Sequence, residues 1–302
     1  MGRRKGPPGP DGFVVIDKPV GPTSFGVMRA AQRALGARKA GHAGTLDPAA
    51  TGVLIVLLGE GTKLSQWVIG HDKAYRATIA LGSITDTLDA EGEVLESAPV
   101  LEAHTDETAV RAALETLVGP QEQIPPAYSA IKVDGRSLMS RARAGEAVAP
   151  KPRSVVCRSL SLVSIENNHI VVDVECGKGY YVRSLARDLG AALGIPAHLH
   201  ALRRTRSGGF SVEEAVPLEG LSREAIRPFA DVAFDIEKIR LSDVEATAIR
   251  HGRPVPAKAD APDRAILCDD TGRPLAMAER LDTIWKVVRG FKQPEQPTLS
   301  TP

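Results

Sequence analysis

The sequence predicts a protein of mixed helices and strands, in which one large domain precedes a small, mostly β domain. Two observations lead to this prediction: strand and amphipathic-helix patterns both recur along the chain, and the composition changes near residue 225. With 302 residues, the chain is long enough to bury a sizeable core in such an arrangement.

The first elements follow a short polar segment. Residues 1–10 are rich in Gly and Pro, and we predict a disordered tail there. Phe13 to Ile16 then form a buried strand, and a turn leads into a helix. Thr23 or Ser24 is the expected N-cap, because either side chain can accept a hydrogen bond from a free helical N–H. The predicted apolar stripe of this helix consists of Phe25, Met28, Ala31 and Leu35.

A glycine-rich loop, residues 41–52, separates this helix from the apolar run 53–58. We expect a capped helix over residues 62–69 and a strand over residues 73–82, where the side chains show strand-like alternation. Residues 85–94 are acidic and are predicted to form a loop with a turn at Glu91-Gly92.

The rest of the large domain alternates in the same way. We expect a helix near residues 107–118, a hairpin at Asp134-Gly135, a strand over residues 169–176 and a helix that ends at Gly194. A capping box from Ser211 to Glu214 follows.

The small domain is predicted over residues 226–290. It contains a helical segment, residues 242–252, and short strands with turns at Asp270-Thr271-Gly272 and Gly290. Residues 291–302 are predicted to be a disordered tail.

The charge of the chain is concentrated in segments. Residues 1–41 hold eight Lys or Arg against two Asp or Glu, residues 132–158 hold seven against two, and residues 178–206 hold six against one. Residues 84–107 hold eight Asp or Glu and no Lys or Arg. The basic segments are either solvated faces or, if the fold brings them together, one surface for a polyanion.

Composition also indicates the compartment. Cys157, Cys176 and Cys268 lie far apart without paired spacing, which argues against a disulfide framework or a zinc knuckle and fits a reducing cytosol. The longest apolar run, Val53 to Leu58, is far shorter than the roughly 20 residues of a membrane-spanning helix. We therefore expect a cytoplasmic protein.

Asp47, in the stretch GHAGTLDPAATG, has two interpretations. It is either a helix N-cap with Pro48 at the first helical position, or a reactive group in a loop whose glycines leave room for a ligand and which also holds His42. The patterns of aspartyl phosphatases, aspartic proteases, phosphate-binding loops and metal sites are absent from the sequence. On the second interpretation, Asp47 is an unpaired nucleophile or base.

Four further residues have a structural and a functional interpretation. Tyr75 is a strand tyrosine that belongs either to the core or to a site. Arg183 lies at a predicted strand-to-helix junction, where it forms either a surface ion pair or part of a site. Tyr180 and Tyr181 are adjacent and face opposite sides of an extended segment, so at most one of them lines a site.

Five ordered segments together resemble one enzyme family. They are VIDKPVGPTSFGVM, AGHAGTLDPAATGVLIVLLGEGTKL, KAYRATIALGSITDTLDAEG, QIPPAYSAIKVDGRSLMSRAR and GYYVRSLARDLGAALG with AHLHALRR. Between about residue 12 and residue 215, this set is similar to the TruB family of bacterial tRNA pseudouridine-55 synthases. The segment after residue 225 more weakly resembles the PUA-type RNA-binding domain of that family.

The resemblance implies an α+β fold with two domains. The catalytic domain, residues 11–225, would have a central, mostly antiparallel mixed sheet flanked by helices, and residues 226–290 would form a PUA-like domain. The implied reaction converts one T-loop uridine of tRNA to pseudouridine after base flipping, with no cofactor and no metal. The expected partner is tRNA, with no membrane and no obligatory protein partner, and the chain is expected to be a monomer.

The resemblance also implies roles for particular residues. Asp47 matches the nucleophile, Tyr75 the tyrosine that stacks on the flipped base and is proposed to help move the C5 proton, and Arg183 the arginine paired with the aspartate. Whether Asp47 attacks base C6 or ribose C1′ stays open. The residues that match contacts to the target nucleotide or its loop are His42, Tyr181 and Leu202.

Basic side chains and a clasping segment complete the expected RNA site. Residues 124–152 match a thumb-like RNA-clasping element, in which Met139 and Arg141 stand where relatives often carry tyrosines. This departure bears on RNA contacts there and not on the chemistry. The basic residues expected to contact RNA are Lys18, Arg29, Arg33, Lys63, Lys132, Arg136, Arg143, Arg203 and Arg204.

Overall fold

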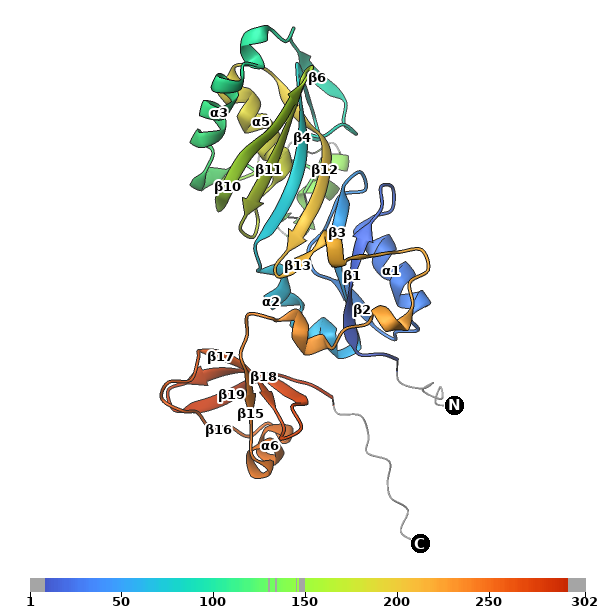
Figure 1. The fold of residues 1–302 in the computed structure, drawn as a ribbon, viewed down its shortest axis with the longest axis vertical. Coiled ribbons are helices and arrows are strands. Elements are labelled where there is room, and N and C mark those ends of the chain that lie inside the picture. Colours follow the sequence, from blue (N-terminus) through green and yellow to red (C-terminus); the bar gives the residue numbers. More distant parts are fainter. Residues whose placement is uncertain (1–8, 130, 134, 145, 147–149, 293–302) are drawn as a thin grey trace.

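The computed structural model describes residues 9–129, 131–133, 135–144, 146 and 150–292. Within them, a large and a small sheet form two parts of the molecule, one above the other in Figure 1. Most of the two predicted tails and Asp134 of the predicted hairpin lie outside the described residues. No helix of the described segments is long and apolar enough to cross a membrane.

The large sheet has ten strands. They are β1 (Gly12–Lys18), β2 (Ala40–His42), β3 (Thr51–Leu58), β4 (Lys73–Leu81), β7 (Gly119–Gln123), β10 (Arg153–Glu166), β11 (His169–Cys176), β12 (Ala197–Ser207), β13 (Phe210–Ser211) and β14 (Val216–Pro217). Their order is β14-β1-β3-β12-β4-β11-β10-β7, with β2 paired to β3 and β13 to β12. The β1–β14 and β12–β3 pairs are parallel and the other described pairs are antiparallel, which confirms the expected mostly antiparallel mixed sheet.

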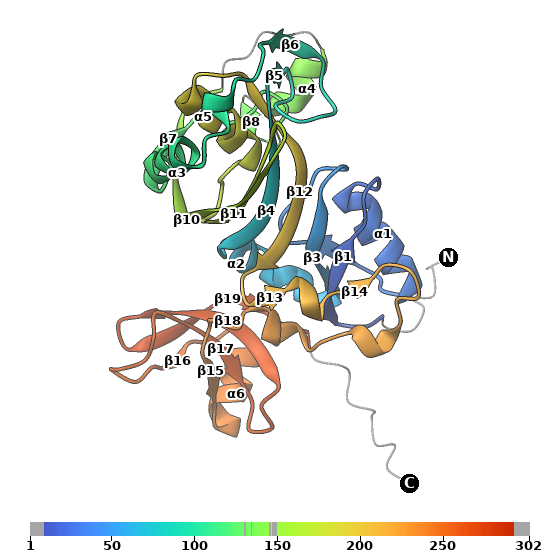
Figure 2. The same cartoon turned by 45° about the horizontal axis from the view of Figure 1, so that its top comes forward.

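Helices and short hairpins surround this sheet (Figures 1 and 2). The helices are α1 (Ser24–Ala34), α2 (Ser65–Ile69), α3 (Glu107–Thr116), α4 (Leu138–Arg143) and α5 (Val182–Leu193), with 3-10 turns η1 (Gly59–Leu64), η2 (Glu102–His104), η3 (Val212–Glu214), η4 (Arg223–Ala225) and η5 (Phe229–Val232). The hairpins are β5 (Ser83–Thr85) with β6 (Val94–Ser97) and β8 (Lys132–Val133) with β9 (Arg136–Ser137).

Two helix predictions need correction. The helix expected over residues 62–69 is a 3-10 turn followed by the short α2, and neither start has a side-chain cap. In α1, Thr23 is the N-cap as expected, but Phe25 is 63% exposed and does not belong to the apolar stripe. Because Val27, Met28 and Ala31 pack on the sheet, the position of Phe25 turns toward solvent.

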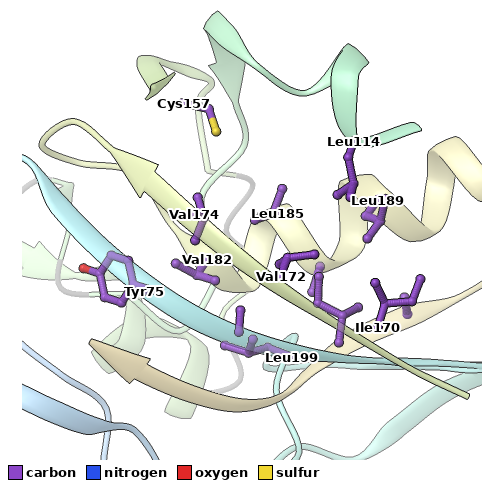
Figure 3. Close-up of a cluster of buried hydrophobic side chains, with 14 of the residues drawn as sticks. Tyr75, Leu114, Cys157, Ile170, Val172, Val174, Val182, Leu185, Leu189 and Leu199 are labelled. Atoms are coloured by element: carbon purple, nitrogen blue, oxygen red, sulfur yellow. The ribbon is translucent and has the colours of Figure 1, made fainter. Parts of the chain in front are cut away.

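The core around β4 and β11, in the upper part of Figure 1, lies between α3, α5 and one face of the large sheet (Figure 3). Alternate residues of β4, namely Tyr75, Ala77 and Ile79, contribute to it together with Leu185 and Leu189 of α5. The other face of these strands is open to solvent and carries ion pairs such as Arg76–Asp173. The chain therefore buries the face of β4 that holds Tyr75.

Strand β12 joins the two halves of the large sheet, because it pairs with β3 on one side and β4 on the other. At this junction, Arg204 lies opposite Gly52 of β3 and Tyr75 of β4. Gly52 has a φ of 99°, and a Cβ there would lie 2.1 Å from the carbonyl oxygen of Arg204. Only glycine allows this approach, so this glycine of the Asp47 loop makes room for a neighbouring strand.

The small domain has five strands and one helix, as a mostly β domain should. They are β15 (Lys238–Arg240), α6 (Asp243–Arg250), β16 (Val255–Pro256), β17 (Arg264–Cys268), β18 (Pro274–Leu281) and β19 (Ile284–Gly290). The preceding segment belongs by its contacts to the large sheet: Arg227 pairs with Phe13, and Val232 is buried beside Phe13. The same cluster includes Ile266 and Met277, so one core joins the two sheets.

Candidate active site

Asp47 lies in the loop between β2 and β3, and no helix begins there. Its carbonyl accepts a hydrogen bond from Ala50 N at 3.1 Å, and the chain then enters β3. The N-cap interpretation is therefore wrong. The Asp47 side chain is 43% exposed, so its carboxylate is accessible at the surface of the sheet junction.

Three buried side chains stabilise this loop through hydrogen bonds to its backbone. Ser24 Oγ lies 2.8 Å from both the N and the O of Leu46. Lys18 Nζ donates to the carbonyls of Pro19, Pro48 and Ala50 at 2.9, 3.0 and 2.7 Å. Arg204 donates to the carbonyls of Gly44, Thr45 and Val53 at 3.1, 3.5 and 2.6 Å.

These contacts correct two predicted RNA contacts. Lys18 is fully buried and Arg204 is 1% exposed, so neither lies on a basic surface. Burial lowers the pKa of Lys18, while the nearby Asp47 carboxylate acts in the opposite direction. Both cations donate to main-chain carbonyls of the Asp47 loop and of the segments that flank it, so their polar groups are satisfied in the interior.

Arg183 is the second residue of α5, just after the extended Tyr181. Its Nε lies 3.2 Å from Asp47 Oδ2, and its Nη1 lies 3.3 Å from Asp89 Oδ2. The guanidinium also donates to the carbonyls of Thr87 and Tyr128 at 3.0 and 2.8 Å. With a side chain that is only 10% exposed, Arg183 presents one fixed edge to Asp47.

Tyr75, on β4, borders the site. The residue is 9% exposed and lies at one end of the core cluster, with its hydroxyl directed away from the aliphatic side chains (Figure 3). Burial raises the pKa of Tyr75, and the positive charge of Arg204 partly offsets that effect. The resting phenol is therefore protonated, and Arg204 contacts both Tyr75 and the Asp47 loop.

The other residues matched to nucleotide contacts lie on the elements around this group. His42 ends β2, and its Nδ1 is buried without a hydrogen-bond partner among the described residues. Burial lowers the pKa of His42, which favours a neutral ring. Tyr181 is fixed at both backbone groups by Gln123, at 2.9 and 3.1 Å. Leu202 is half-buried on β12.

Sequence reasoning missed Asp89, Ser24 and Gln123. Asp89 lies in the acidic stretch for which the sequence predicts a loop. The structure anchors this loop to β12, because Leu199 N donates to Leu88 O at 3.0 Å. Leu88 has a φ of 62°, an unfavourable value for leucine that the surrounding contacts impose. This positive φ is not visible in the sequence, and it directs Asp89 toward Arg183.

The remaining basic residues have different surroundings. Arg29 and Arg33 are exposed on α1, and Arg203 pairs with Asp17 at 2.8 Å. Lys63 pairs with Glu60 at 2.6 Å and also donates to Gly290 O of the small domain. Arg136 and Arg141 both pair with Glu146. The side chains of Lys132, Met139 and Arg143 lie outside the described part of the chain.

We expect Lys18→Met to destabilise the protein by about 3 kcal/mol, because three loop carbonyls lose a charged donor in a buried setting. Denaturant unfolding measures this change. Lys39→Met is the matched control, since Lys39 is exposed on the same half of the molecule. An equal and small effect of both substitutions would contradict the assigned role of Lys18.

Lys73 gives a pH-dependent prediction. It is buried beside Gly44 and Arg204, and burial lowers its pKa from 10.5 to about 8. Between these values the unfolded chain binds more protons than the folded chain, so this group makes the folded state gain stability as the pH rises. We expect the unfolding free energy of the wild type to rise relative to Lys73→Met between pH 8 and 10.5. Parallel curves of unfolding free energy against pH for the two proteins would contradict this prediction.

Family models identify the class of protein that this fold and site define. The model for the TruB family pseudouridylate synthase N-terminal domain matches residues 32–182. The model for the tRNA pseudouridylate synthase B C-terminal domain matches residues 183–231. The two matches meet within α5 beside Arg183. Because both models describe pseudouridylate synthases, the chain is of the pseudouridylate synthase class.

Individual relatives agree with these matches. The chain is 45% identical over 258 residues to tRNA pseudouridine synthase B of Aromatoleum aromaticum, covering 83% of each chain. It is 44% identical over 279 residues to tRNA pseudouridine synthase B of Thermobifida fusca, covering 89% of this chain and 94% of that one. The chain belongs to the TruB family.

A solved structure confirms the fold. An H/ACA RNP bound to a substrate RNA that contains 2′-deoxyuridine contains a chain with a TM-score of 0.70 to this one. The similarity covers 94% of this chain and 86% of that chain at 23% sequence identity. The shared fold therefore extends over the large and the small domain.

Proposed function

We propose that this chain converts the T-loop uridine at position 55 of tRNA to pseudouridine. The observation that carries the proposal is the Asp47–Arg183 pair, set beside Tyr75 where the two halves of the sheet meet. It occurs in a TruB-family chain whose relatives are tRNA pseudouridine synthases B. A carboxylate held by a guanidinium beside an aromatic ring suits a uridine that has been turned out of its loop.

Asp47 is the proposed nucleophile. The adjacent guanidinium of Arg183 favours the ionised carboxylate and fixes one of its oxygens. Attack at base C6 or at ribose C1′ both use this carboxylate. Asp47 forms a bond at one of these carbons, the C1′–N1 bond breaks, and the uracil turns within the pocket. A C1′–C5 bond then forms, the bond to Asp47 breaks, C5 loses its proton and N1 gains one. The product is an isomer of the substrate, so no water, cofactor or metal enters the proposed reaction.

Tyr75 is proposed to stack on the flipped base and to help move the C5 proton. Its raised pKa keeps the phenol neutral and its ring face apolar, which suits stacking. His42, Tyr181 and Leu202 are proposed to contact the target nucleotide or the loop that it leaves, since each lies on an element that borders the Asp47–Arg183 pair.

The wider RNA site is proposed to include exposed basic residues, with the clasping segment over residues 124–152 and the PUA-like domain as further contacts. Arg29 and Arg33 on α1 are exposed, and Arg136 in the clasping segment and Arg203 on β12 remain partly exposed in their ion pairs. We propose these four arginines as phosphate contacts. The chain is proposed to act as a cytoplasmic monomer without an obligatory protein partner.

The test uses the lone purified chain and unmodified tRNA carrying tritium at uridine C5. Release of label from wild-type tRNA, and none from tRNA with cytidine at the target position, is the expected result. Binding without release would indicate a non-catalytic RNA-binding protein instead. Release only after addition of a guide RNA and partner proteins would indicate a guide-dependent enzyme.

A further inference from the structure

Helix α1 carries an exposed stripe in which the proposed function uses two arginines but leaves a phenylalanine without a role. Phe25, Arg29 and Arg33 are spaced by four residues, so they lie along one face of the helix, and all three are exposed. The opposite face, including Val27, Met28 and Ala31, packs on the sheet. The helix itself contains no acidic residue.

Phe25 is an unusual residue to expose. It is 63% exposed, and no aromatic ring of the described residues packs on it. Phe234, the other strongly exposed phenylalanine in the described part of the chain, packs on His71 and Phe210. Val20, at 65% exposure, precedes the same helix. Together, Phe25, Val20 and the two arginines give this end of the molecule an exposed surface that is both apolar and basic.

The stripe begins beside the Asp47 loop. Ser24, which directly precedes Phe25, is hydrogen-bonded to Leu46, and Gly21 N donates to Pro48 O at 3.0 Å. Figures 1 and 2 both show the β1–α1 connection beside the β2–β3 loop. The eight helical steps from Phe25 to Arg33 extend about 12 Å from there.

Surfaces that bind single-stranded nucleic acid combine aromatic faces for bases with basic side chains for phosphates. We propose that Phe25, Arg29 and Arg33 form such a strip, which binds the RNA strand next to the flipped uridine. Phe25 stacks on a base or ribose beside the target nucleotide, and the two arginines bind phosphates farther along. This inference rests on the proposed function, because it assigns the same tRNA substrate to the strip.

The test compares the affinity of full-length variants for unmodified tRNA. Phe25→Ala is expected to weaken binding about tenfold, while Phe25→Tyr retains most of the affinity because it keeps the aromatic face. The loss of affinity should exceed any loss in the rate of label release at saturating enzyme. Leu101→Ala is the matched control, because Leu101 is 59% exposed just before η2, in a segment with no proposed RNA contact.

The two arginines have a separate readout. Arg29→Gln and Arg33→Gln are each expected to reduce the slope of log Kd against log salt by about 1, as the loss of one phosphate contact predicts. Arg76→Gln, in an exposed ion pair on the solvent face of the sheet, should leave the slope unchanged.

Two results would overturn the inference. Phe25→Ala could bind tRNA within twofold of the wild type, as expected if the strip contacts a protein instead, or Leu101→Ala could lose as much affinity. Either result is compatible with label release by the wild type. It would therefore reject the RNA-binding role of the strip without rejecting the proposed function. Absence of label release from the wild type would instead reject the proposed function.

Discussion

Asp47→Asn is expected to reduce label release from tRNA by about 10⁴-fold or more, the scale seen when a nucleophile is removed. The amide is nearly the same size as the carboxylate but cannot form the proposed bond at C6 or C1′. Since Asp47 is partly exposed and its loop is held by Lys18, Ser24 and Arg204, the fold should persist. Affinity for tRNA should stay within several-fold of the wild type.

The matched control for this substitution is Asp173→Asn. Asp173 also pairs with an arginine, Arg76, but on the solvent face of the sheet. It should retain activity, because an exposed ion pair contributes little to stability. Normal turnover by Asp47→Asn would remove Asp47 from the role of nucleophile, whatever the activity of the control.

Arg183→Lys is expected to lower the rate of label release at saturating tRNA by about 100-fold or more. The substitution keeps the positive charge but loses the planar fork that contacts Asp47, Asp89 and two carbonyls together. An ammonium group cannot reach all of these partners from one position. The Asp47 carboxylate therefore loses its fixed orientation.

Arg187→Lys is the control for Arg183→Lys. Arg187 lies one turn farther along α5 and pairs with Asp188, away from Asp47. Single-turnover rates at saturating enzyme separate an effect on the chemistry from an effect on binding. Equal rates for the Arg183 and Arg187 variants would show that the fork of Arg183 has no special part in the reaction.

Local patterns in the sequence predicted the elements that form the frame of the site. The apolar run 53–58 became β3, the alternation after residue 73 became β4, and Gly194 ends α5 with a φ of 72°. These features depend on neighbouring residues and therefore appear in a linear reading. The resemblance to a known family then assigned roles to Asp47, Tyr75 and Arg183.

Long-range contacts account for what the sequence could not predict. A run of basic residues does not show which of them is buried, so Lys18 and Arg204 were expected at the surface, although they bind loop carbonyls up to 160 residues away. Asp89 depends on a backbone anchor to β12, and the exposure of Phe25 depends on how α1 packs on the sheet. None of these contacts leaves a local pattern.

The most direct test of the central claim maps the product on the RNA. Unmodified tRNA is incubated with the lone chain, and pseudouridine is located by its chemical adduct, which stops reverse transcription. We expect one pseudouridine for each tRNA, at the T-loop uridine, with wild-type protein and none with Asp47→Asn. Modification at other positions, or the same product from Asp47→Asn, would contradict it.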